Sequence, residues 1–143
     1  MGLLEPKKKL LIKLAEMNRY LEELEEMFPD EDAYLDNLAL RRACEKTIEL
    51  AIESVLDIVA LIVVEEKLGF PEGEDSLIKL LKDKKIITEK LAAILMEMKG
   101  FRNILVHRYG NINNELVYTF LSEELNDFNE FEKQIRNWLK AKK

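Results

Sequence analysis

One short segment of the chain holds most of the side chains that could perform acid–base or phosphate chemistry. Residues 100–110 read GFRNILVHRYG and contain Arg102, Asn103, Tyr109 and His107, the one histidine of the chain. An imidazole with an ordinary pKa of about 6.5 can accept or donate a proton near neutral pH. A guanidinium can hold a phosphate or a carboxylate through two parallel hydrogen bonds. These residue types therefore favour proton transfer beside a phosphate group.

Other chemistries find little support in the sequence. There is no Gly-rich phosphate loop or GK[ST] motif, and neither Cys44 nor any serine lies within a few residues of His107. One cysteine and one histidine cannot assemble a four-ligand zinc site, so we expect no metal and no cofactor. Glu49 and Glu53 could form a carboxylate pair for glycoside hydrolysis, but acids four residues apart on a helix are more often a solvated or ion-paired stripe.

The elements that must position these residues are predicted to be helices. The chain has 143 residues, of which 48% are hydrophobic and 35% are charged, as expected for one domain spanning 1–143. Its 5 glycines and 3 prolines are too few for the turns of a many-stranded fold. We predict an all-α, up-and-down bundle of four main helices plus short helices.

The apolar residues recur at steps of three and four, which gives the approximate limits of each helix. A nearly all-apolar stretch, 48–64, marks the second main helix as central and buried. The predicted segments are Pro6 to Phe28, about Tyr34 to Lys67, a short helix Leu77 to Lys82 capped by Asp75 or Ser76, a helix from Thr88 to near Gly110, a short segment Leu116 to Leu121, and a final helix starting at Ser122.

Helical geometry places Arg102 in an unusual position. At 100° per residue, Arg102 falls about 40° from Met98 and so inside the apolar stripe, whereas His107 and Asn103 share the opposite face. A buried guanidinium cannot lose its charge and needs an anionic partner. The internal candidates lie on the second main helix, namely Glu45, Glu49 and Glu53. A purely structural alternative is an Arg–Glu packing pair beside a histidine that interacts with the helix dipole.

The charge distribution suggests where an anion could bind. The net charge is -6, so attraction of the whole molecule to a polyanion is not expected and any contact with nucleic acid must be local. Residues 99–110 contain Lys99, Arg102 and Arg108 and no acid. The longest apolar run, 58–64, is far too short to span a bilayer, and 1–9 has no signal-peptide pattern, so we expect a cytoplasmic protein without membrane contact.

The string Arg102-Asn103-x-x-x-His107-x-Tyr109, late in the third main helix of an acidic helical chain, resembles the signature of HEPN-domain ribonucleases. Its His-x-Tyr extension is similar to the HepT branch, the toxin half of HepT/MntA toxin–antitoxin pairs. The likeness covers nearly the whole chain and includes Arg42-x-x-Glu45, Ile86-Ile87, Met98-x-x-Phe101 and Val117-Tyr118. The chain departs from the usual pattern at Asn113, where family members often carry an acid.

The resemblance implies a toxin that cleaves RNA, such as a tRNA or an mRNA, without a metal ion. Arg102 and His107 would be the catalytic residues, Asn103 would support them, and Lys99 and Arg108 would contact the RNA. Because one histidine per chain cannot be both base and acid in one step, we expect a homodimer whose cleft contains two copies of each residue.

The resemblance also implies a partner and a modification. Tyr109 would accept AMP from an MntA-like nucleotidyltransferase antitoxin, and the added phosphate would exclude RNA by charge and volume. Two alternatives remain open at this point: a non-catalytic HEPN-type module that binds a nucleotide or the nucleotidyltransferase, and a purely structural helical dimer.

Overall fold

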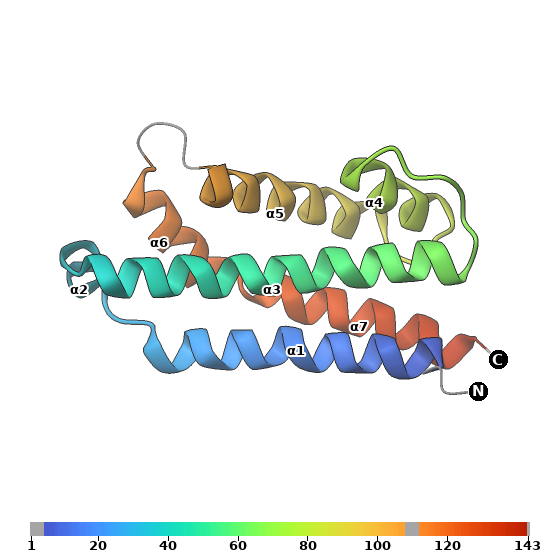
Figure 1. The fold of residues 1–143 in the computed structure, drawn as a ribbon, viewed down its shortest axis with the longest axis horizontal. Helices are drawn as coiled ribbons and strands as arrows, with labels where there is room; N and C mark the ends of the chain where they lie inside the picture. The colour runs from blue at the N-terminus through green and yellow to red at the C-terminus, as the bar shows by residue number, and fades with distance from the viewer. Residues whose placement is uncertain (1–4, 108–111, 143) are drawn as a thin grey trace.

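The computed structural model describes residues 5–107 and 112–142, so the predictions for Arg108 and Tyr109 lie outside the described residues. Within these ranges the chain is helical and the four long helices alternate with short ones, which confirms the predicted all-α fold (Figure 1). The helices are α1 (Pro6–Met27), α2 (Glu31–Asp36), α3 (Leu38–Glu65), α4 (Glu74–Asp83), α5 (Glu89–His107), α6 (Asn114–Glu123) and α7 (Asn126–Ala141).

The four long helices run alternately up and down the long axis of the molecule, with α3 in the middle (Figure 1). Helix α1 packs along α3, and α5 and α7 also lie against this bundle. The short helices α2 and α6 lie together at one end, near the end of α5 that carries His107. Helix α4 packs against α3 and α5 towards the other end. The bundle therefore holds the two ends of α5 in different surroundings.

The core is centred on α3, as the apolar run predicted. Its fully buried residues include Ile48, Ile52, Ile58 and Ile62, which share one broad side of the helix. Burying one such side chain stabilises the fold by about 1.5–3 kcal/mol. On α7, Phe128, Phe131 and Ile135 are fully buried, at the steps of three and four that predicted this helix.

The prediction of one helix from about Tyr34 to Lys67 is wrong at its start. The helix is interrupted at Asn37, which has extended backbone angles and lies between the end of α2 and the start of α3. The Asn37 side chain accepts a hydrogen bond from the backbone N–H of Leu40 at 3.0 Å and so caps α3. Asparagine is among the best N-cap residues, so this local bond competes with an uninterrupted helix.

Of the predicted ends of the other helices, one is confirmed and two are wrong. Thr88 caps α5 as predicted, because its hydroxyl accepts from the Leu91 N–H at 3.1 Å. The predicted cap of α4 is wrong: Gly73 occupies that position with φ 125°, a conformation that favours glycine. The predicted start of the last helix at Ser122 is also wrong, since Ser122 lies inside α6 and donates to the Tyr118 carbonyl.

No helix in the ranges 5–107 and 112–142 is both long enough and apolar enough to cross a membrane.

Candidate active site

The predicted site residues that the structure describes lie on the second half of α5. Arg102 has only 14% of its side chain exposed, which confirms its predicted place on the packed face of the helix. Asn103 is half-buried, and His107 is exposed as the last residue of α5. The helix therefore presents the imidazole to solvent and keeps the guanidinium against the protein.

Two carboxylates from different helices hold the Arg102 guanidinium. Its Nη1 lies 3.9 Å from Glu53 Oε2 on α3, which confirms Glu53 as one of the three expected candidates. Its Nη2 donates to Glu74 Oε1 in the first turn of α4, a partner that the sequence analysis did not identify. The Arg102 Nε is buried and has no hydrogen-bond partner among the described residues. One donor of the guanidinium thus remains available for an acceptor that the described residues do not provide.

The other two candidate partners of Arg102 are wrong, because each forms a bond within its own helix. The fully buried Glu45 accepts two hydrogen bonds from Arg42 Nη1, at 3.1 and 3.3 Å. Glu49 pairs with Lys46 at 3.1 Å. Glu45 and Glu49 of α3 are therefore paired with cations of their own helix, and of the three candidates Arg102 contacts Glu53.

Glu53 has an unusual environment for a surface carboxylate. Burial raises the pKa of its carboxyl group, and the negative charge of Glu49 and a hydrogen bond with Glu49 raise that pKa further. The charges of Arg102 and Lys46 act in the opposite direction. Glu53 therefore binds a proton more readily than an ordinary glutamate, and Arg102 makes its closer contact with Glu74.

A second ion pair links the same two helices. Lys99, one turn before Arg102 on α5, donates to Asp75 Oδ1, next to Glu74 on α4. The first turn of α4 thus places two adjacent carboxylates on two cations of α5. Lys99, predicted to contact RNA, already has an anionic partner in this structure.

Cys44 offers no alternative nucleophile. Its side chain is fully buried, and burial together with the nearby charge of Glu45 raises the pKa of the thiol to about 11. A thiol in such surroundings stays protonated near neutral pH and is inert. Among the described residues, 5–107 and 112–142, no group of three His, Cys, Asp or Glu side chains could hold a metal ion.

An up-and-down helical bundle whose third long helix carries Arg102-Asn103-x-x-x-His107 near its end is characteristic of the HEPN class. A solved structure with this fold, a tri-AMPylated HEPN toxin of Shewanella oneidensis in complex with an MNT antitoxin, matches with a TM-score of 0.84 and 26% identity. The match covers 90% of this chain and 96% of that one. The chain belongs to the ribonuclease HepT-like family, because the family model described as "Ribonuclease HepT-like" matches residues 17–135.

Curated relatives support the same family. The chain is 26% identical over 122 residues to the mRNA nuclease HepT of Shewanella oneidensis, which covers 85% of this chain and 92% of that protein. It is 32% identical over 110 residues to a putative RNase of Archaeoglobus fulgidus, covering 73% of this chain and 82% of that protein. The resemblance inferred from residues 102–109 is thereby confirmed at the level of the family.

Proposed function

We propose that this chain is the toxin component of a toxin–antitoxin pair and acts as a metal-independent endoribonuclease, within one helical domain spanning 1–143. The observation that carries the proposal is the placement of Arg102, Asn103 and His107 on the second half of α5, in a family whose relatives are named as nucleases. Arg102 and His107 would act on the RNA directly, Asn103 would support them, and Arg108, outside the described residues, would contact the RNA.

The RNA itself supplies the nucleophile in this reaction. One His107 takes the proton of a 2′-hydroxyl, and the oxygen forms a bond to the adjacent phosphorus. The bond from phosphorus to the 5′-oxygen breaks, and a second imidazole gives that oxygen a proton. Arg102 holds the phosphate and stabilises its additional charge, using donors such as the buried Nε. The products are a 2′,3′-cyclic phosphate and a 5′-hydroxyl.

RNA cleavage in the presence of EDTA tests this function. We expect the purified chain to cut single-stranded RNA at the same rate with and without the chelator, because no step requires a metal ion. Mass spectrometry of the products should show 2′,3′-cyclic phosphate ends. An absolute requirement for Mg²⁺, or products with 5′-phosphate ends, would contradict the proposed chemistry.

The two proton transfers require two histidines, so we propose a homodimer formed through α5 and α7. Exposed apolar side chains near His107 support an interface at this end of α5: Ile104 is 58% exposed and Val106 is 46% exposed. The two side chains leave α5 on different sides, and large apolar side chains exposed close together often mark a contact surface. A two-fold axis there would bring two copies of His107 and Arg102 into one cleft.

Ile104→Asp should separate the two subunits and abolish cleavage, because it places a charge in the proposed interface at a side chain that is 58% exposed. Sedimentation at micromolar concentration should show the mass of two chains for the wild type and of one chain for the variant. Ile12→Asp is the matched control, since Ile12 is 48% exposed on α1. A wild-type monomer that cuts RNA would rule out the two-histidine mechanism.

Glu74→Ala should lower the rate of RNA cleavage about tenfold, because Arg102 loses the hydrogen bond that orients its guanidinium. Glu74→Gln should be affected less, since an amide oxygen can still accept that bond. Single-turnover cleavage measures the effect, and circular dichroism checks the fold. Glu72→Ala is the control, because Glu72 is exposed in the neighbouring loop. Equal rates for Glu74→Ala and the control would show that Glu74 does not position Arg102.

Regulation by a nucleotidyltransferase is the last element of the proposal. Solved relatives of this chain include a toxin that is AMPylated and bound to an MNT antitoxin. We propose that an MntA-like antitoxin transfers AMP to Tyr109, which lies outside the described residues, two positions beyond His107. The added phosphate would then compete with RNA for the cationic side chains of the site.

A further inference from the structure

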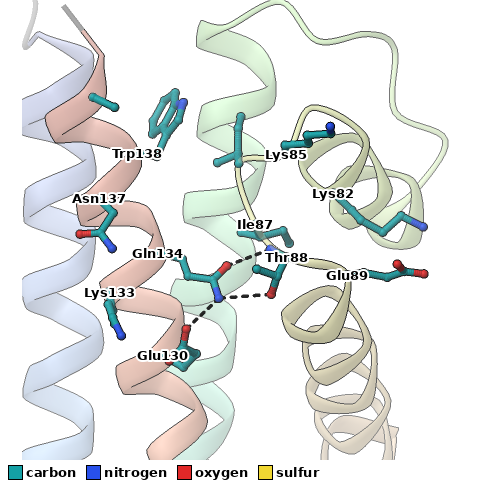
Figure 2. Close-up of a pocket in the computed structure, with 12 residues that line it drawn as sticks. Lys82, Lys85, Ile87, Thr88, Glu89, Glu130, Lys133, Gln134, Asn137 and Trp138 are labelled. Carbon is teal, nitrogen blue, oxygen red and sulfur yellow. Dashed lines mark hydrogen bonds between the residues drawn. The ribbon is translucent and has the colours of Figure 1, made fainter.

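A groove of about 910 Å³ lies between α7 and the turn that joins α4 to α5 (Figure 2). Gln134 on α7 spans its floor and makes three hydrogen bonds. Its Oε1 accepts from the Thr88 backbone N–H at 2.9 Å, and its Nε2 donates to the Thr88 hydroxyl at 3.2 Å and to Glu130 at 2.8 Å. The side-chain amide fixes α7 against the start of α5, so the groove is formed before any ligand binds.

Two lysine-rich segments of an acidic chain meet at the groove. Residues 79–85 contain four lysines and one acid, and residues 133–142 contain four cations and no acid, although the net charge of the chain is -6. Lys82, Lys85 and Lys133 line the groove, and none of the three has an ion pair with a described residue. Two acids also line it, Glu89 and Glu130, and the second is bound by Gln134.

An aromatic ring also lines the groove. Trp138, the one tryptophan of the chain, is half-buried and projects from α7 into the groove (Figure 2). Lys142 Nζ lies 5.7 Å from the centre of its ring. Lysines that neutralise phosphates next to an aromatic face on which a base can stack are the usual components of a single-strand binding surface.

Among the described residues, the two cations of the site on α5 are not free to hold RNA. Both Lys99 and Arg102 are paired with the carboxylates of α4. From Thr88 to Arg102 the distance along α5 is about 20 Å, at 1.5 Å per residue. A strand cut near His107 can therefore reach the groove with nucleotides several positions from the cleaved bond.

We infer that this groove is an RNA-binding site separate from the cleavage site, which takes a single-stranded segment with its phosphates on Lys85 and Lys133 and a base against Trp138. The inference rests on the proposed function for the identity of the ligand. Its role is to supply the affinity that the paired cations of α5 do not provide.

The test uses the full chain and a labelled oligo-uridylate of about twelve residues with 2′-O-methyl groups, which lacks the nucleophile and is not cut. Binding should quench the fluorescence of Trp138, since a base stacks against its ring. The signal can be assigned to this residue because the chain has one tryptophan. Lys85→Gln/Lys133→Gln should raise the Kd measured by anisotropy about tenfold. It should also reduce the salt dependence of binding by about 1.4 in log–log slope, as expected for two lost phosphate contacts on a single strand.

Lys67→Gln/Lys8→Gln is a closely matched control. Lys67 and Lys85 both follow a helix end with positive φ, 53° and 60°, and Lys8 and Lys133 are both exposed on long helices. Equal Kd values for the two double variants would overturn the inference, as would an unchanged fluorescence at saturation. Equal quenching by free AMP at the same concentration would also overturn it, because the groove would then bind mononucleotides.

Cleavage assays separate this inference from the proposed function. If the wild type cuts RNA and Lys85→Gln/Lys133→Gln has an unchanged KM, the groove is not an RNA site and the function stands. If the wild type does not cut RNA but binds the oligonucleotide through the two lysines, the groove stands and the nuclease function fails. Circular dichroism of both double variants shows whether the fold is retained.

Discussion

His107→Ala lowers the rate of RNA cleavage by about 10²- to 10⁴-fold, the usual contribution of a general acid or base. The histidine lies exposed at the end of α5, so its truncation leaves the core intact. Circular dichroism and sedimentation should therefore match the wild type. Cleavage of a fluorescent RNA under single-turnover conditions gives the rate, and growth of cells that express the variant should no longer be inhibited.

The control for this variant is Lys90→Ala, an exposed position at the other end of the same helix. Arg102→Ala should also abolish cleavage, with some loss of stability because Glu74 and Glu53 lose a common partner. If folded His107→Ala cuts RNA as fast as the wild type, the protein is better described as a binding module that lacks catalysis.

Tyr109→Phe should keep the protein toxic even when the nucleotidyltransferase partner is present, because the hydroxyl that accepts AMP is missing. Intact-mass analysis after co-expression should show increments of whole AMP units on the wild type and none on the variant. We expect the variant to lose all of the AMP increments and to keep its full toxicity, since a chain without the modification has nothing in its cationic site to exclude RNA.

Two other tyrosines provide controls for this prediction. Tyr118 donates a hydrogen bond to the Pro29 carbonyl at 2.9 Å and stacks on Phe28, so its hydroxyl is already engaged. Tyr20 is half-buried on α1. Tyr118→Phe and Tyr20→Phe should both keep the AMP increments. Increments that persist in Tyr109→Phe would place the switch at another residue.

The long helices and their buried faces could be predicted from the sequence, because the spacing of apolar residues determines which face of a helix is buried. The fully buried Leu14, Met17 and Leu95 recur at the predicted steps of three and four, and the fully buried Ile52 lies in the predicted apolar stretch 48–64. The same geometry predicted that Arg102 would be largely covered. The break at Asn37 was missed because a single side-chain hydrogen bond decides it, and apolar periodicity contains no information on such a bond.

Of the two carboxylates that pair with Arg102, the sequence predicted Glu53 and did not predict Glu74. Glu53 could be proposed because its helix was predicted to be the neighbour of α5. Glu74 lies on a short helix whose direction depends on the loop before it, including Gly73 with φ 125°. From the sequence this helix was predicted to begin at Leu77, with Asp75 or Ser76 as its cap, so Glu74 was given no role. Only the three-dimensional arrangement shows that this acid faces α5.

The two carboxylates in the first turn of α4 have a consequence for how such a toxin could diversify. Glu74 and Asp75 occupy the cations of α5, yet neither belongs to the segment 102–109 on which the proposed chemistry depends. Substitutions in this short helix would change how the Arg102 guanidinium is held and how readily a phosphate displaces the carboxylates, while His107 and Tyr109 stay the same. Relatives that differ in this helix are therefore expected to differ in basal activity, and each partner antitoxin would have to restrain a different one.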